Sequence, residues 1–493
     1  MKMKILMIMK GHEYLALEIL STSLKLAGHH VELIFDPSLF DDAFISSAFL
    51  MKKFNADRAI IRKAVNYAPD YVLFTLYSND VTWAQKRAKE LKQATGAKVI
   101  VGGPHATAVP ELVAEYPYFD YVMMGDGEET LPQLIESINN NRSPKTVRGT
   151  YYREDGKIIG TENHHLTQNL DIFPPDKEQF YCAAPWATKE YNLLVSRGCG
   201  YKCTYCYNNT KYALWDRQGQ YLRYRSIDSV ISELSAMQER NKYTLVNIWD
   251  DNLIMNRNYA HDFFDEYKKK IHIPFKIFVH PLHIDNGIAQ LLSEAGCWGV
   301  EIGVQAVDEC GRRLCGRKES DGDIKRAVEI LKNSGLKVIL DFMVGLPFQT
   351  YRDIYSMCEF VAKIKPDQSR IFLTRYFPKT ELTQIAYNEG LISDYDLNEI
   401  NNGTSRDSYI YNKKLNKQID RVRSLLIVAH YFPLEFIKFM KKIRIEIWLP
   451  RFNSFFQMVM TARGFFQPYN DIARSFLKKY RYYLLGDGRK WLK

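Results

Sequence analysis

The chain has 493 residues, more than one hydrophobic core usually spans, so its length predicts two or three domains. Its composition, 46% hydrophobic and 25% charged residues with a net charge of +10, excludes an intrinsically disordered chain. Three of the eight cysteines fall within eight residues, which excludes a secreted disulfide scaffold and favours metal binding in a reducing compartment. No stretch approaches the roughly 20 apolar residues of a membrane span, so we expect a cytoplasmic protein.

Residues 1–145 are predicted to form a doubly wound, flavodoxin-like α/β domain. Its expected strands are Lys4–Met9, His30–Phe35, Tyr71–Leu76, Lys98–Val101 and Tyr121–Met124. Helical patterns lie between the strands, as in Tyr14–Ala27 and Thr82–Thr95. Glycines follow the last two strands, where ligands of such domains bind and where a backbone can approach a ligand closely.

Residues 146–190 are predicted to be a linker with a small hairpin. Residues 191–378 repeat a strand and a helix six times, which indicates a partial (βα)6 barrel. Its expected strands are Tyr191–Ser196, Leu245–Trp249, Phe275–His280, Gly299–Val304, Val338–Val344 and Arg370–Tyr376. Active sites of such barrels form at the carboxyl ends of the strands, and the clustered cysteines directly follow the first strand.

Residues 379–493 are predicted to be a helical region, rich in basic and aromatic residues. From residue 401 to the end there are 19 Lys and Arg and 6 Asp and Glu, a charge of 19 − 6 = +13. Apolar stretches such as Phe432–Met440 and Phe455–Met460 separate these charges. Three alternatives stay open: packing over the barrel mouth, contact with a membrane surface and a lipid-like substrate, or nucleic-acid binding. The last is disfavoured because no nucleic-acid-binding module is visible.

The cysteines form the segment Cys199-Gly-Tyr-Lys-Cys203-Thr-Tyr-Cys206. Three thiolates at this spacing can hold a 4Fe–4S cluster and leave one iron open, as a catalytic metal site requires. Zinc is the alternative, but it would need a fourth ligand that the neighbouring residues do not offer. The other cysteines have no cluster spacing; Cys310 and Cys315 stand near the barrel mouth in sequence, so a catalytic thiol is an alternative to an incidental one.

A CxxxCxxC motif after the first strand of a six-unit barrel, with Tyr205 before the last cysteine, resembles the radical S-adenosylmethionine (SAM) superfamily. The resemblance implies a 4Fe–4S cluster on Cys199, Cys203 and Cys206, with SAM on the open iron. It also implies an external one-electron donor of the flavodoxin or ferredoxin type, and reductive cleavage of SAM to a 5′-deoxyadenosyl radical.

The same resemblance assigns a SAM site to residues at the barrel's strand ends. Asp250 and Asp251 resemble the position that binds the SAM amino group, and Gln305 resembles the ribose contact. Gly345 and Pro347 lie in a segment resembling the adenine-binding one, and Tyr205 resembles the aromatic residue beside adenine. The alternative is that the acidic residues cap a loop and that Gln305 is an ordinary polar rim residue.

A doubly wound domain before this barrel resembles the cobalamin-binding subgroup, which includes anaerobic Mg-protoporphyrin monomethyl ester cyclases and methylases of unactivated carbon. The matching residues that would bind cobalamin are Gly102, Gly103, His105, Thr107, Gly125, Gly127 and Glu128. The Asp-x-His-x-x-Gly signature that supplies a lower cobalt ligand is missing. His12 or His105 could approach cobalt, but both fit ordinary loop histidines as well.

The resemblance implies a radical SAM enzyme that methylates, or oxidatively cyclises or rearranges, an unactivated carbon. The motifs do not separate these reactions. The alternative is a non-catalytic iron–sulfur and corrinoid carrier or sensor, which would need no SAM site. A methylthiotransferase is excluded because it would carry three more cysteines in its N-terminal domain, and residues 1–181 contain none.

Overall fold

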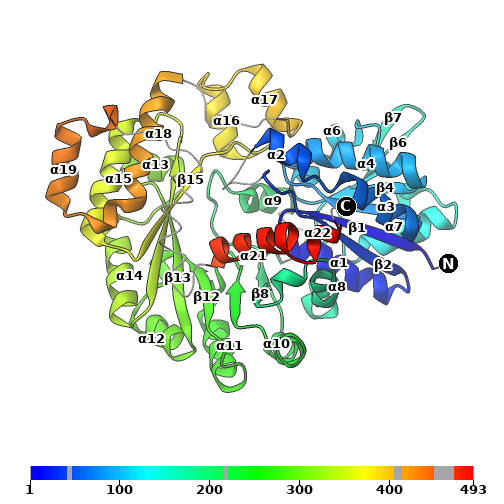
Figure 1. Ribbon diagram of the computed structural model, residues 1–493, viewed down its shortest axis with the longest axis horizontal. Coiled ribbons are helices and arrows are strands. Elements are labelled where there is room, and N and C mark those ends of the chain that lie inside the picture. The colour runs from blue at the N-terminus through cyan, green and yellow to red at the C-terminus, as the bar shows by residue number, and fades with distance from the viewer. Residues whose placement is uncertain (1, 42–46, 216–219, 405–412, 449–470, 492–493) are drawn as a thin grey trace.

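A computed structural model describes residues 2–41, 47–215, 220–404, 413–448 and 471–491. Two large sheets lie side by side, each with its own helices, and a helical C-terminal region contacts both (Figure 1). None of the described helices has the length and hydrophobicity needed to cross a bilayer. The predicted apolar stretch Phe455–Met460 lies outside the described residues.

The N-terminal sheet has a parallel core in the order β2-β1-β3-β4-β5, the flavodoxin-like order, which confirms the predicted doubly wound fold. These strands are β1 (Lys4–Lys10), β2 (His30–Asp36), β3 (Tyr71–Thr75), β4 (Lys98–Gly102) and β5 (Tyr121–Met123). All five residues of β3 are buried because helices cover both faces. The longer of these helices are α1 (Leu15–Leu26), α3 (Asp57–Tyr67), α4 (Val81–Thr95) and α7 (Thr130–Asn139).

Residues predicted as a linker hold a hairpin that extends this sheet. Its strands, β6 (Thr150–Glu154) and β7 (Lys157–Gly160), pair antiparallel, and β6 pairs with β5. Beyond the hairpin, α8 (Lys177–Ala183) packs against β2 and α1. The chain thus adds two strands to the N-terminal domain before it enters the barrel.

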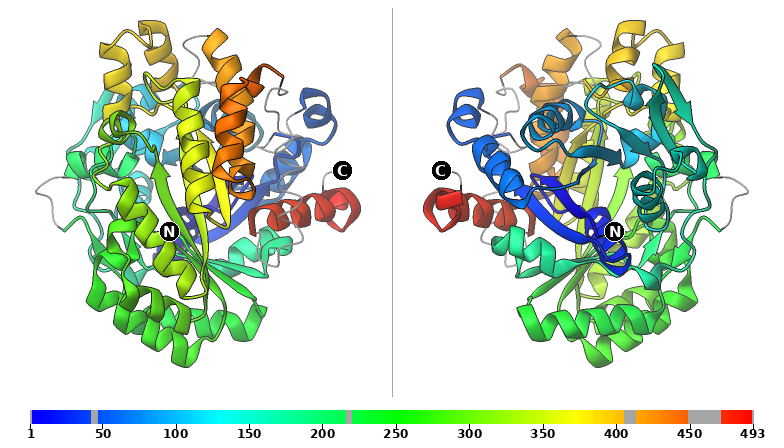
Figure 2. Two further views of the ribbon diagram at one scale, coloured as in Figure 1. Left: turned by 90° about the vertical axis from the view of Figure 1, so that its left-hand side faces the viewer. Right: turned by 90° about the vertical axis from the view of Figure 1, so that its right-hand side faces the viewer.

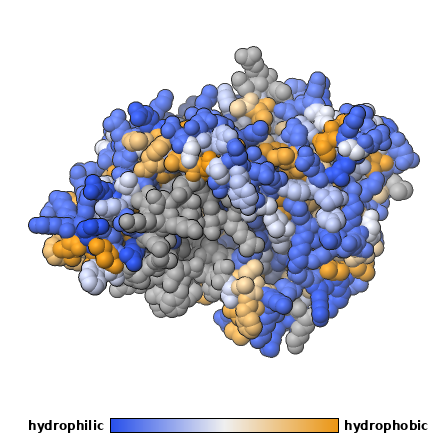
Figure 3. Space-filling model, turned by 90° about the horizontal axis from the view of Figure 1, so that it is seen from above, coloured by the Kyte–Doolittle hydropathy of each residue, from blue (hydrophilic) through white to orange (hydrophobic). Residues whose placement is uncertain are grey.

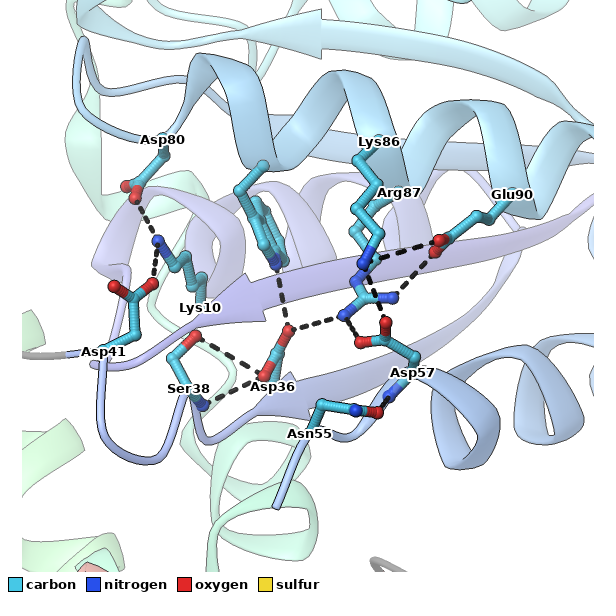
Figure 4. A network of polar contacts seen from close by, with 11 residues as sticks. Lys10, Asp36, Ser38, Asp41, Asn55, Asp57, Asp80, Lys86, Arg87 and Glu90 are labelled. Carbon is cyan, nitrogen blue, oxygen red and sulfur yellow. Dashed lines mark hydrogen bonds and ion pairs between the residues drawn. The ribbon is translucent and has the colours of Figure 1, made fainter. Parts of the chain in front are cut away.

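Charged residues at the ends of β1 and β2 fix helix α4 to the sheet (Figure 4). Lys10 pairs with Asp80 at 3.2 Å and with Asp41 at 3.3 Å. Asp36 accepts a hydrogen bond from the Trp83 indole at 3.0 Å and lies 3.5 Å from the guanidinium of Arg87. These charged side chains therefore pair with one another inside the N-terminal domain.

The second sheet contains six parallel strands whose spatial order follows the chain, which confirms the predicted partial barrel. They are β8 (Glu190–Leu193), β11 (Leu245–Ile248), β12 (Phe275–Val279), β13 (Cys297–Gln305), β14 (Lys337–Val344) and β15 (Gln368–Leu373). The helices between them include α10 (Ile227–Asn241), α11 (Arg257–Lys270), α12 (Asn286–Glu294), α14 (Asp321–Asn333) and α15 (Tyr351–Ile364).

The strand predicted over Tyr191–Ser196 is wrong at its end, because β8 stops at Leu193. Ser196–Arg197 forms a separate short strand, β9, which pairs antiparallel with β10 (Arg223–Tyr224). The Asp250 carboxylate accepts hydrogen bonds from the amides of Val195 and Ser196, so these amides turn away from the sheet.

The C-terminal region is helical, as predicted, and reaches both edge strands of the barrel sheet. Its helices are α16 (Glu381–Asn388), α17 (Asp394–Asn401), α18 (Lys413–Val428), α19 (Leu434–Lys442), α21 (Asp471–Leu485) and α22 (Gly488–Trp491). Helix α18 packs against α15 and β15. On α21, Lys478 pairs with Glu190 of β8 at 3.0 Å, and the Tyr480 hydroxyl accepts a hydrogen bond from the Phe40 amide. Both views in Figure 2 show α21 and α22 beside the first strands of the N-terminal sheet.

Candidate functional site

The three clustered cysteines lie in the loop between β9 and α9 (Tyr207–Trp215), beyond the carboxyl end of β8. Gly198 has a φ of +94°, and a Cβ there would lie 2.5 Å from the Tyr221 carbonyl oxygen, so only glycine fits. The amide of Cys206 donates to the carbonyl of Cys203 at 3.1 Å. The loop therefore turns tightly around its cysteines.

The three thiols are electrostatic neighbours. Burial raises the pKa of Cys206 to about 12, and Asp251, Cys203 and Cys199 add to the rise. Burial likewise raises the pKa of Cys199, with further contributions from Asp251 and Cys203. Among the described residues, no three His, Cys, Asp or Glu side chains converge closely enough to hold a single metal ion. A 4Fe–4S cluster takes each thiolate on a different iron and does not need that convergence.

The two adjacent aspartates at the end of β11 have different surroundings. Asp250 is fully buried, and its carboxylate accepts hydrogen bonds from the amide of Val195 at 2.9 Å and from the hydroxyl of Ser196 at 2.5 Å. Asp251 is exposed and lies close enough to Cys199 and Cys206 to raise the pKa of both thiols. Asp250 thus supports the cysteine loop from behind, whereas Asp251 faces the thiols.

An arginine that no sequence motif marks, Arg317, lies near the thiols of Cys199 and Cys203. The Arg317 guanidinium pairs with Glu319 at 2.5 Å and donates to the carbonyl of Gly303 at the end of β13. Burial alone would lower the pKa of Arg317, but nearby Tyr205, Glu319 and Cys203 raise it. The site therefore contains a fixed positive charge beside the cysteines, in a stretch that carries no recognisable motif.

An aromatic and acidic network connects this arginine to the cysteine loop. The ring of Tyr201 stacks on His280 with centroids 4.0 Å apart, and its hydroxyl lies 2.9 Å from Nε2 of His283. Burial alone would raise the pKa of Glu319, but His280, whose Nε2 lies 3.5 Å from Glu319 Oε2, and the charge of Arg317 lower it to about 2. Glu319 is therefore ionised at neutral pH and holds both neighbours in place.

The predicted residues at the ends of β13 and β14 occupy unusual backbone positions. Gln305 has a φ of +66° and sits where the register between β13 and β14 shifts. Gly345 has a φ of +91°, and its amide donates to the side chain of Gln349 at 2.6 Å. Pro347 is buried beside it. Both segments are thus held in defined conformations at the strand ends.

The concave face of the barrel sheet is polar, unlike the aliphatic interior of a closed barrel. Strand residues of one parity, such as Val246, Ile277 and Leu340, are buried in the core under the helices. The strand residues that alternate with these point to the concave face and are Asn192, Asn247, Lys276, Glu301, Asp341 and Arg370. Glu301 accepts from Lys276 at 3.0 Å and from Arg370 at 2.7 Å. The Oδ1 atom of the buried Asp341 makes no hydrogen bond.

Aromatic side chains follow this polar layer toward the carboxyl ends of the strands. Trp249 is 42% exposed and Phe372 is 49% exposed, although both belong to the barrel. Phe278 lies between them on β12, with its ring 5.2 Å from that of Trp249. Exposed aromatic faces above a buried polar layer form a surface suited to a small molecule with an apolar part.

A cavity of about 250 Å³ lies at the carboxyl ends of β3, β4 and β5. Six of the residues predicted to bind cobalamin line it: Gly102, Gly103, Thr107, Gly125, Gly127 and Glu128. Arg197, Tyr207 and Lys211 close the cavity from the barrel side. The cavity therefore lies between the two domains, next to the cysteine loop.

Neither candidate histidine lines this cavity. His105 is buried, its Nδ1 lies 2.9 Å from the hydroxyl of Ser78, and burial lowers its pKa to about 4. His12 packs against Tyr14, with ring centroids 4.6 Å apart. Both surroundings fit the alternative of ordinary loop histidines.

Buried ion pairs join the cavity wall to the cysteine loop. Asp126 pairs with Arg223 at 2.6 Å, with Lys211 at 2.8 Å and with Arg197 at 3.3 Å. Glu128 pairs with Arg197 at 2.5 Å, and its Oε2 is buried without a hydrogen-bond partner. Arg197 lies two residues before Cys199, so the N-terminal cavity and the cysteine loop share this charged wall.

The comparisons with known families match the two domains separately. Residues 193–361 match the Radical SAM superfamily, and residues 10–135 match the B12 binding domain. The first match contains all three clustered cysteines, and the second contains the glycines that line the N-terminal cavity.

Individual relatives are distant but cover most of the chain. An uncharacterised methyltransferase of Pyrococcus horikoshii is 25% identical over 74% of this chain and 76% of its own. An anaerobic magnesium-protoporphyrin IX monomethyl ester cyclase of Rubrivivax gelatinosus is 21% identical over 73% of this chain and 63% of its own length. The solved structure of OxsB, a cobalamin-dependent S-adenosylmethionine radical enzyme, superimposes with a TM-score of 0.67 at 14% identity, over 98% of this chain and 84% of that one.

Proposed function

This chain belongs to the cobalamin-binding subgroup of the radical SAM superfamily, and we propose that Cys199, Cys203 and Cys206 hold the 4Fe–4S cluster of an enzyme that cleaves SAM reductively. Its cofactors are this cluster, SAM and cobalamin. When bound, the cluster supplies one electron to break a carbon–sulfur bond of SAM, and cobalamin supplies a carrier for a methyl group. The observation that carries the proposal is the grouping of three thiols beside Asp251 at the barrel's open end.

SAM fits the polar groups around these thiols. We propose that the carboxylate of Asp251 pairs with the SAM ammonium and that the Arg317 guanidinium pairs with the SAM carboxylate; the proposal is supported by the nearness of both side chains to the thiols. We assign the ribose contact to Gln305 and the adenine site to Tyr205 with the segment from Gly345 to Pro347. Asp250 then positions the loop, since its carboxylate is occupied by backbone amides.

The N-terminal cavity suits cobalamin. Its wall contains small residues that admit a bulky ring, and the orphaned Oε2 of Glu128 offers an acceptor to the amide groups that surround a corrin. No histidine lines the cavity, so we infer that neither His12 nor His105 ligates the cobalt. A corrinoid absorbance band that co-elutes with the protein, and that persists in His12→Ala and His105→Ala variants, is the expected result.

The substrate is a small molecule, which we place on the concave face of the barrel. There the aromatic side chains of Trp249, Phe278 and Phe372 contact its apolar part, and the polar layer beneath binds its polar groups. We propose methylation, or oxidative cyclisation or rearrangement, of an unactivated carbon in this substrate. Incubation with SAM labelled in its methyl group distinguishes the two, because only methylation transfers the label.

The test of the central proposal is anaerobic reconstitution followed by electron paramagnetic resonance of the reduced protein. Wild type should bind about one cluster and release 5′-deoxyadenosine from SAM when reduced by dithionite or by a flavodoxin- or ferredoxin-type donor. Alanine at Cys199, Cys203 or Cys206 should abolish both signals. Cys310→Ala, the same change at an exposed cysteine, is the matched control and should keep both. A Cys203→Ala variant that still cleaves SAM contradicts the proposal.

A further inference from the structure

A chain of hydrogen bonds joins the N-terminal domain to the concave face of the barrel sheet. Glu13, which follows β1, accepts a hydrogen bond from Nδ2 of Asn192 on β8 at 2.8 Å. The Oδ1 atom of Asn192 accepts hydrogen bonds from the Trp249 indole at 2.8 Å and from Nδ2 of Asn247 at 3.1 Å. A residue of the first domain therefore reaches the surface on which we place the substrate.

A buried lysine holds Glu13 in this position. Polar side chains gather on the outside of the molecule, as the largely hydrophilic face in Figure 3 shows. By contrast, the side chain of Glu13 is 7% exposed, and that of its ion-pair partner Lys177 is 0% exposed. Glu18 on α1 lies 3.0 Å from the same ammonium. Burial and the charge of Glu13 raise the pKa of Glu18 well above its usual range, so Glu18 is the neutral one of the two acids.

The partners of the two asparagines fix the orientation of their amide groups. An indole N–H only donates, so the oxygen of Asn192 faces Trp249 and its nitrogen faces the Glu13 carboxylate. With that oxygen in place, Asn247 turns its own nitrogen toward Asn192. The Oδ1 atom of Asn247 is then left over: it is buried and has no hydrogen-bond partner among the described residues.

This unpaired oxygen belongs to a side chain on the concave face. Val246 and Ile248, the strand neighbours of Asn247, are buried in the core under the helices, so the Asn247 side chain points the other way. Asn247 is 2% exposed, so water does not compensate for the missing partner. Because a buried acceptor without a hydrogen bond is costly, we take this oxygen as a place prepared for a donor that the protein itself does not supply.

We propose that the Asn247 carbonyl accepts a hydrogen bond from an O–H or N–H group of the substrate, and that Glu13 is the positioning residue that keeps this carbonyl turned toward the substrate. The proposal rests on the proposed function, because it takes the substrate to lie on the concave face. Glu13 is already paired with Lys177, so this chain of hydrogen bonds has no carboxylate left to balance a substrate cation. The donor is therefore an uncharged group, such as a hydroxyl.

The test compares two uncharged probes with the same ring, 2-phenylethanol and its methyl ether, which lacks the O–H group. Their binding is measured by ligand-observed NMR on anaerobically reconstituted protein that contains SAM and cobalamin but no reductant. Wild type should bind the alcohol about tenfold more tightly, the effect of one hydrogen bond to a buried acceptor that is otherwise unsatisfied. Asn247→Leu, which has a similar volume and no polar atom, should remove this preference.

Glu13→Ala should reduce the preference to about twofold or less, because both amides are then free to turn over. Glu18→Ala is the matched control: it also removes an acidic neighbour of Lys177, but Glu18 does not contact Asn192, so the preference should remain. Glu13→Ala should also shift the indole N–H resonance of Trp249, identified through Trp249→Phe. The resonance of Trp83, whose indole donates to Asp36, should not move, which separates a local change from general destabilisation.

Equal affinity of wild type for the two probes, or no saturable binding of either, overturns the inference. A tenfold preference that survives in Glu13→Ala, with the Trp249 resonance unmoved, overturns the positioning role of Glu13. Iron–sulfur absorbance is recorded before a probe is added. Wild type that does not take up the cluster contradicts the proposed function instead, so the two failures are distinguishable.

Discussion

Replacement of Asp126 by asparagine tests the charged wall between the two domains. The carboxylate is buried and has three cationic partners within 3.3 Å, Arg223, Lys211 and Arg197. Burial alone would raise its pKa, but Lys211, Arg197 and Arg223 lower it well below its usual range. The asparagine side chain of Asp126→Asn keeps the shape of the aspartate and removes its charge. Arg197 then keeps only Glu128 of its two acidic partners.

Removing one partner of a buried ion pair costs roughly 3–5 kcal/mol because the remaining charge stays buried. We expect a loss of this size in the unfolding free energy of Asp126→Asn at pH 7. The sign of the pH dependence follows from the lowered pKa: the stabilisation by Asp126 is present above its unfolded pKa of about 3.9 and is lost as the pH falls through the lower folded value. The difference between wild type and variant should therefore shrink in acid.

Urea denaturation without cofactors measures this difference, and Asp487→Asn is the matched control. Asp487 pairs with Lys490 at 3.6 Å with both side chains 87% exposed, so the same substitution there should cost less than about 1 kcal/mol. Asp126→Asn should also bind corrinoid more weakly than wild type, because Asp126 lines the N-terminal cavity. If Asp126→Asn is as stable as Asp487→Asn, the buried ion-pair arrangement is refuted.

Three further substitutions test separate parts of the site. Burial raises the pKa of Asp250 to about 7, so the stability that its protonated side chain contributes is full below the unfolded pKa and falls as the pH rises. In urea titrations from pH 4 to 8, the unfolding free energy of wild type should therefore fall by up to roughly 4 kcal/mol relative to that of Asp250→Asn. Gly125→Ala would place a Cβ 2.6 Å from the ring of Trp215, so it should destabilise the protein and weaken corrinoid binding. Gly156→Ala, at a similar positive φ in open space, should cost only about 1 kcal/mol; equal costs would contradict the steric argument. Gln305→Gly relieves a positive φ and should keep or raise the melting temperature while raising the KM for SAM; an unchanged KM removes Gln305 from the SAM site.

The strands and the position of the cysteine loop were predictable because they depend on local patterns. Unbroken apolar runs such as Tyr71–Leu76 indicate strands buried on both faces, and glycine-rich ends such as Gly102-Gly103 mark the ligand edge of a parallel sheet. The CxxxCxxC spacing is likewise contained in eight consecutive residues. Each of these signals can be read from consecutive residues, without knowing which distant segments they contact.

Contacts between distant segments were not predictable in the same way. Arg317 reaches the cysteine loop only because the turn after α13 (Glu309–Leu314) packs on it, with the Thr204 hydroxyl donating to the Leu314 carbonyl at 2.6 Å. Arg197 pairs with acids about seventy positions earlier in the chain. An isolated arginine in a sequence carries no mark of its partner, so neither side chain could be assigned before the fold was known.

The difference between Asp250 and Asp251 shows the same limit within a single motif. Asp250 and Asp251 follow β11 directly, yet Asp250 is buried and Asp251 is exposed, so the two neighbouring carboxylates face different surroundings. Asp250 accepts hydrogen bonds from the amides of Val195 and Ser196, just beyond the end of β8 at Leu193, so its carboxylate faces the segment that leads into the cysteine loop. The sequence therefore identifies the pair, but only the hydrogen bonds in the folded protein assign the loop-supporting role to Asp250, and this is why we propose Asp251 as the residue that contacts SAM.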